Sequence, residues 1–167
     1  ANDIAVLVRN NKDLDPLIPI LDREKIPYII ESDNNVLEDI DVGKVVLLLR
    51  SVNAPMENEY IIKAMLMDCF DINPLDVFKI SKSRYDDKLK IWELLTDSEK
   101  LKSMDLKNLK AIYDFVNLYT DSKKGFIKVA HNNKLDEVFV EVLNRSGLLA
   151  KILVKPHAQE ILQRVSR

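Results

Sequence analysis

The chain has 167 residues, of which 47% are hydrophobic and 31% are charged. This length and composition predict one ordinary globular domain with a real core, and they exclude a largely disordered chain. No stretch approaches the roughly 18 apolar residues of a membrane span, and the N-terminus lacks a secretory signal pattern, so we expect a soluble, cytoplasmic protein. With a single cysteine, Cys69, the chain forms no internal disulfide and no cysteine metal cluster.

The formal net charge of −2 hides an uneven distribution along the chain. Residues 1–78 carry a net charge of −8, residues 79–142 carry +2 and residues 143–167 carry +4. The acidic first half argues against a protein whose whole surface wraps nucleic acid, whereas the second half leaves room for local contact with phosphate.

The first 31 residues have the pattern of one βαβ unit. The β-branched apolar run at residues 4–8 is typical of a buried strand. A helix capped by Asp15, with Pro16 in its first position, is expected to follow, and residues 27–31 are expected to form a second strand.

From residue 32 onward the pattern is helical, and residues 32–41 are polar enough to be the crossing between the two parts. Asn73 is the expected cap of one helix and Gly147 the expected end of another. We therefore predict a mostly α fold, in which an N-terminal βαβ piece is followed by a multi-helix bundle. Because the chain begins on a strand and ends inside an amphipathic helix, we expect it to be part of a larger protein. The predicted helices cover residues 42–52, 60–66, 74–80, 89–95, 105–119, 138–143 and 156–165.

Residues that carry catalysis are missing from the sequence. The three glycines lie far apart, so neither a P-loop nor a dinucleotide-binding loop is present. His131 and His157 have no partner at metal-ligand spacing, and the acidic pairs 38–39 and 86–87 are better explained as caps or solvated faces. We predict no catalytic residue, no metal ligand and no cofactor in this chain.

The best candidate for DNA contact is a basic cluster with two aromatic residues nearby, Tyr85 and Trp92, as stacking groups. A solvated helix face is the alternative, because six acids lie among the nine basic residues of 79–110. Tyr113 and Tyr119 are expected to serve packing. The predicted DNA-binding residues are Lys79, Lys82, Arg84, Lys88 and Lys90.

The first half of the chain resembles superfamily 1 DNA helicases of the UvrD/Rep type. The resemblance covers roughly residues 3–78, with a faint echo at residues 143–148. In that family a strand ending in arginine, a helix and an Ile-Pro-Tyr strand begin the second motor domain, as at Arg9 and residues 26–28 here. An apolar pair with acids, then a helix ending in Leu-Arg, follow there as in residues 36–50 here.

This resemblance implies that residues 1–31 belong to the 2A motor domain and residues 32–167 to the inserted, helical 2B subdomain. The chain itself would then be non-catalytic, engaging DNA and regulating unwinding for repair or recombination. ATP and Mg²⁺ would be bound by the rest of the helicase motor, which would be its partner. The alternative is a protein-interaction module that docks a nuclease or accessory subunit without touching DNA.

One departure from the family concerns phosphate binding. Where several relatives have a Gly-Ile-Gly hairpin that offers backbone N–H groups to DNA, this chain has Asp71, Ile72 and Asn73. An acid in place of the first glycine removes the freedom in φ and adds a repelling charge, so we expect no phosphate binding there.

Overall fold

The computed structural model describes residues 4–28, 39–155, 158 and 161. Within these residues it contains ten α-helices and no strand, so the mostly α prediction is confirmed. Residues 4–28 hold a short 3₁₀ turn, Asn11–Leu14, and helix α1, Ile18–Arg23. The remaining helices form what we call the helical body: α2 Ile40–Asn53, α3 Asn58–Met65, α4 Pro74–Asp87, α5 Ile91–Thr96, α6 Ser98–Ser103, α7 Leu109–Thr120, α8 Phe126–Asn132, α9 Leu135–Arg145 and α10 Leu148–Leu153.

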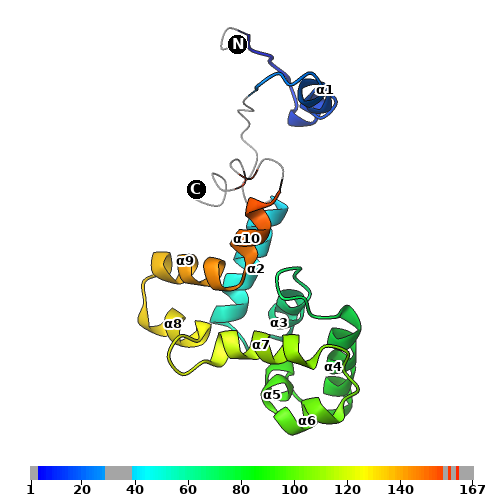
Figure 1. The fold of residues 1–167 in the computed structure, drawn as a ribbon, viewed down its shortest axis with the longest axis vertical. Coiled ribbons are helices and arrows are strands. Elements are labelled where there is room, and N and C mark those ends of the chain that lie inside the picture. The colour runs from blue at the N-terminus through cyan, green and yellow to red at the C-terminus, as the bar shows by residue number, and fades with distance from the viewer. Residues whose placement is uncertain (1–3, 29–38, 156–157, 159–160, 162–167) are drawn as a thin grey trace.

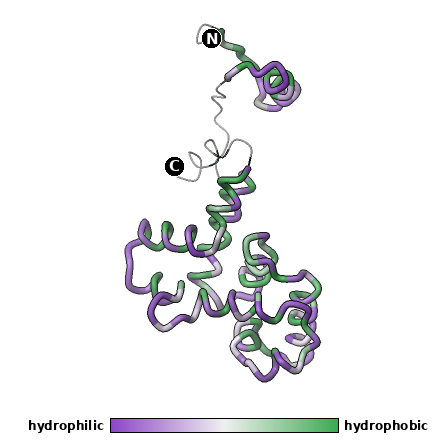
Figure 2. Tube along the Cα trace, in the orientation of Figure 1, coloured by the Kyte–Doolittle hydropathy of each residue, from purple (hydrophilic) through white to green (hydrophobic). Residues whose placement is uncertain are grey.

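Helices α2 and α7 join the two sides of the helical body (Figure 1). Helices α3 to α6 gather on one side and α8 and α9 on the other, α10 packs against α9, and α2 packs against α3, α8 and α9. Helix α7 packs against both α5 and α8. Hydrophilic and hydrophobic residues alternate along these helices, as expected when each helix turns one face to a shared core (Figure 2).

The centre of the core is a cluster of aromatic rings around Tyr119 on α7. The Tyr119 ring lies 4.8 Å from Phe115, 5.4 Å from Trp92 and 5.5 Å from Phe126, measured between ring centres. Its hydroxyl is 2.6 Å from the Ser51 hydroxyl on α2, so the one polar atom of the ring is satisfied in the interior. The cluster thus ties α2, α5, α7 and α8 together.

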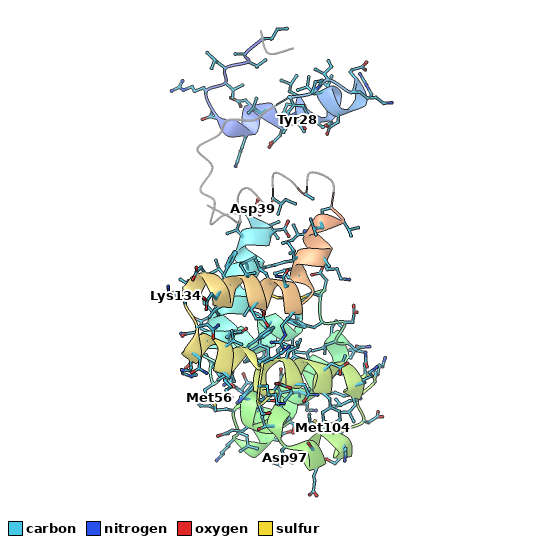
Figure 3. All side chains as sticks on the ribbon, turned by 60° about the vertical axis from the view of Figure 1, so that its left-hand side comes forward. Tyr28, Asp39, Met56, Asp97, Met104 and Lys134 are labelled. Carbon is cyan, nitrogen blue, oxygen red and sulfur yellow. The ribbon has the colours of Figure 1, made fainter. Side chains whose placement is uncertain are left out.

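Local capping signals fix several helix ends in the body. The Asn73 side chain accepts a hydrogen bond from the Leu75 N–H at 2.9 Å, and Pro74 occupies the first position of α4, as predicted. Gly147 follows α9 with a φ of +78°, a conformation that glycine adopts without strain, which confirms the predicted end of that helix. Asp39 caps α2, and Asp97 and Met104 flank α6 (Figure 3).

Helix α7 begins at Leu109, four residues after the predicted start at residue 105. The reason is a distant side chain: the fully buried carboxylate of Asp76 on α4 accepts hydrogen bonds from the Lys107 N–H at 2.9 Å and the Asn108 N–H at 2.8 Å. These bonds hold the chain outside a helix until Asn108, whose side chain caps α7 by accepting from the Ala111 N–H at 3.2 Å.

The prediction of an N-terminal βαβ piece is wrong for the described residues. The apolar run at residues 4–8 forms no strand there, and its side chains are open to solvent, with Ile4 85% and Leu7 94% exposed. A strand needs a neighbour to pair its backbone N–H and C=O groups, and residues 4–8 have no such neighbour among the residues that the structure describes. Residues 27 and 28 of the second predicted strand are not in a strand either, and the rest of it lies outside the described residues.

The helix between these segments exists but starts at Ile18, so Asp15 does not cap it. The turn at Asn11–Leu14 comes first, closed by Asp13, whose carboxylate accepts from the Asn10 N–H at 3.3 Å. Tyr28 donates to the Asp22 carboxylate at 3.1 Å and so folds back onto α1. Helix α1 has no buried residue.

Most of the helix predicted at residues 156–165 lies outside the described residues. In the part that the structure describes, no helix combines the length and the apolar character needed to cross a bilayer.

Candidate nucleic-acid interface

Helix α4 carries most of the predicted DNA-binding residues, and its inner side fixes its orientation. Val77 and Ile80 are buried in the core, and the buried Asp76 holds the loop before α7. The helix ends at Asp87, the residue after it, Lys88, has a left-handed φ of 55°, and α5 begins after Lys90. The opposite side of α4 is therefore held facing solvent.

That outer side presents apolar and aromatic residues to water. Leu75, Phe78, Lys82 and Tyr85 follow one another at intervals of three, four and three, which places them on one helix face. We call these four residues the α4 outer face. Phe78 is 66% exposed and Tyr85 73% exposed. Exposing these two rings to water does not stabilise the fold.

The five predicted basic residues lie on the last turns of α4 and the loop that follows, but they are not equivalent. The Lys79 ammonium donates to the backbone oxygen of Asp105 and forms an ion pair with the Asp105 carboxylate at 3.2 Å. Neither Lys82 nor Lys88 is held in a hydrogen bond or ion pair with another described residue. Lys79 therefore fastens the 104–108 loop, whereas Lys82 and Lys88 are available to a ligand.

Arg84 packs against Tyr85. Its guanidinium carbon lies 4.2 Å from the centre of the Tyr85 ring, the distance of a cation–π contact. The contact holds a positive charge beside an exposed ring.

The charge around this helix end remains positive after its acids are counted. Residues 79–90 contain five basic and two acidic side chains. Cations in the last turn of a helix also stabilise it through the helix dipole, so the charge alone is compatible with the alternative of a solvated face. A solvated helix face does not explain why exposed aromatic rings accompany these cations.

Of the two rings proposed from the sequence as stacking groups, Tyr85 is exposed and Trp92 is not. Trp92 is 6% exposed and packs against Tyr119, so it is a core residue and cannot stack on a base. Tyr119 is buried and Tyr113 is half-buried, as expected for packing residues. Phe78, which sequence reasoning did not single out, is the second exposed ring on the α4 outer face. The three- and four-residue spacing from Leu75 is the signal that could have identified it.

Residue 71, shortly before α4, has the left-handed backbone conformation that glycine favours, although the residue is an aspartate. Asp71 adopts a φ of 52°, a left-handed conformation, although aspartate lacks the freedom in φ that glycine has. Aspartate is among the few residues that tolerate it. The carboxylate charge remains a repelling group for phosphate, and the Asp71 backbone oxygen accepts from the Asn108 amide at 3.3 Å.

A shallow groove between α2 and α3 offers no comparable set of free polar groups. Its two lysines are already paired: Lys44 with Asp68 at 3.2 Å and Lys63 with Glu59 at 2.6 Å. Across the described residues, no group of three histidine, cysteine or acidic side chains gathers in a way that could hold a metal ion. The residues lining the groove are Lys44, Leu47, Lys63, Leu66, Met67 and Asp68.

Cys69, which follows Asp68, is half-buried. Burial, and to a lesser degree the Asp68 charge, raises the pKa of its thiol to about 11. At pH 8 the thiolate is then roughly 100-fold rarer than for an unperturbed thiol, and we expect Ellman's reagent to label folded Cys69 at least that much more slowly than the urea-unfolded chain. Because the folded pKa is raised, this thiol stabilises the fold below about pH 9 and loses that contribution as the pH rises toward 11. Equal labelling rates for the folded and unfolded chains would contradict this assignment.

The chain shows no significant match to a protein-family model, a curated protein or a solved structure.

Proposed function

We propose that this chain is a non-catalytic part of an ATP-dependent DNA helicase of the UvrD/Rep type, which engages DNA and regulates unwinding. In this proposal the helical body corresponds to a 2B-like subdomain, and the motor elsewhere in the parent protein binds ATP and Mg²⁺. The observation that carries the proposal is the end of α4, where Arg84 packs on the exposed ring of Tyr85 and Lys82 and Lys88 stand three residues before and after that tyrosine.

The chemistry of these residues suits a phosphate backbone. Lysine and arginine displace the counterions condensed on nucleic acid, which gives binding that is independent of sequence and falls steeply with salt. A regulatory region that moves along DNA needs binding that is independent of sequence, because contacts specific to one base sequence would hold the region at that sequence.

Replacing Lys82, Arg84 and Lys88 together with alanine is expected to weaken DNA binding by more than tenfold at low salt. Each lost phosphate contact lowers the slope of log K against log salt by about 0.7 for a single strand and 0.9 for a duplex, so the slope should fall by roughly two to three. Fluorescence anisotropy with labelled oligonucleotides over a salt series measures both quantities.

A matched control removes the same charge elsewhere. Lys110, Lys134 and Lys151 are exposed and lie on α7, before α9 and on α10. Their triple alanine variant should bind DNA with a salt slope close to that of the wild type. If both triple variants lose affinity equally, only the total charge matters and α4 is not the site.

The alternative function is docking of a nuclease or accessory subunit, and the exposed apolar side chains of Leu75 and Phe78 favour it. Binding through apolar surface tolerates salt, whereas binding through phosphate contacts does not. A complex with such a subunit that survives high salt, in a chain that binds no DNA at low salt, would select this alternative.

A further inference from the structure

The phosphate contacts proposed above leave the two exposed rings of α4 without a role. Phe78 and Tyr85 are separated by seven residues, so their side chains leave the helix within about 20° of the same direction. They are about 10 Å apart along the helix axis at 1.5 Å per residue. Lys82 lies between them on the same face. Two rings with a cation between them make up most of the α4 outer face.

We propose that Phe78 and Tyr85 each stack on an unpaired base, so that the ligand of the α4 outer face is single-stranded rather than duplex nucleic acid. This inference rests on the proposed function and names its substrate class. The separation of the rings corresponds to roughly three nucleotides at the 3.4 Å spacing of a stacked strand. Lys82 is then placed to meet a phosphate between the two stacked bases.

The contact between Arg84 and Tyr85 supports this assignment. A guanidinium at 4.2 Å from the ring centre covers one face of the ring, and Tyr85 nevertheless remains 73% exposed. The other face is thus open to a base, and a base on one side with a cation on the other is a favourable arrangement for an aromatic ring.

Phe78, Tyr85 and Lys82 are less well suited to a duplex or to a protein surface. The bases of a duplex are stacked on each other, so the rings of a helix surface cannot reach their faces without opening the duplex. An apolar protein surface laid over Phe78 and Tyr85 would take the Lys82 ammonium out of water without a partner, which costs free energy. Single-stranded nucleic acid uses the rings and the cation together.

The test compares an oligothymidylate of about 12 nucleotides with a hairpin duplex by fluorescence anisotropy. The double variant Phe78→Leu and Tyr85→Leu keeps apolar side chains of similar size but removes both rings. Its affinity for oligothymidylate is expected to fall roughly ten- to 100-fold, with the salt slope and the affinity for the duplex unchanged. Leu135→Ala, at an exposed apolar position on α9, is the control and should bind as the wild type does.

Each outcome separates this inference from the proposed function. A leucine double variant that binds oligothymidylate as tightly as the wild type overturns the stacking. If the Lys82, Arg84 and Lys88 variant loses binding in the same experiment, the proposed DNA contact at the end of α4 is still supported. A wild-type chain that binds neither oligonucleotide overturns both. Equal loss of duplex and single-strand binding in the leucine variant also overturns the inference, because stacking on unpaired bases requires a selective loss.

Discussion

Asp76→Ala is expected to lower the free energy of unfolding by about 3 kcal/mol, although the residue touches no proposed ligand. The Asp76 carboxylate is fully buried and accepts the Lys107 and Asn108 N–H groups at 2.9 and 2.8 Å. Alanine leaves both donors without this partner and removes an acid from the first turn of α4, where the helix dipole favours negative charge. Urea unfolding followed by circular dichroism measures the change.

Two variants separate the hydrogen bonds of Asp76 from a general effect of lost charge. Asp76→Asn keeps one oxygen acceptor and is expected to cost less than the alanine variant. Asp86→Ala removes an exposed acid from the same helix and should change stability by less than about 0.5 kcal/mol. If Asp76→Ala and Asp86→Ala are equally stable, the loop before α7 does not depend on α4.

Tyr119→Ala is expected to have the largest effect, a loss of about 4 kcal/mol in the free energy of unfolding. The ring is fully buried and contacts Phe115, Trp92 and Phe126, so alanine leaves a cavity where four helices meet. Thermal and urea unfolding should both move strongly, and the fluorescence of the neighbouring Trp92 gives a local readout.

Tyr119→Phe divides that loss between the ring and the hydroxyl. Phenylalanine keeps the packing and removes only the contact with the Ser51 hydroxyl, which still donates to the Leu48 carbonyl oxygen at 2.7 Å. A cost of about 1 kcal/mol is expected. If phenylalanine costs as much as alanine, the hydrogen bond rather than the packing holds the helices together.

The helical body could be predicted from the sequence where local signals decide. Asn73 with Pro74 at the start of α4, and Gly147 at the end of α9, are set by caps within a few residues of the helix. The start of α7 could not be predicted in this way, because Asp76, which holds the chain before it, lies 31 residues from Lys107 in the sequence.

The βαβ prediction failed for a related reason. The β-branched run at residues 4–8 has the composition of a strand, but composition does not supply the neighbouring strand that pairs its backbone. No such neighbour is found among the described residues, where the run is exposed.

The sequence analysis proposed a site at residues 79–90 with Tyr85 and Trp92 as its aromatic partners, and the structure contradicts the choice of Trp92, which is buried. Leu75, Val77, Phe78 and Ile80 are all apolar, which leaves two faces of α4 as candidates for the core. The packing of Val77 and Ile80 inward decides the matter and turns Phe78 out. Trp92 is two residues beyond Lys90 in sequence, but it belongs to α5 and to the Tyr119 cluster.

Binding of nucleic acid at the end of α4 is tested by an anisotropy titration of the wild-type chain against single-stranded and hairpin DNA over a salt series. We expect binding that weakens steeply with salt and is tighter for the single strand. Absence of binding to both at low salt would contradict it and would leave the α4 outer face as a docking surface for protein.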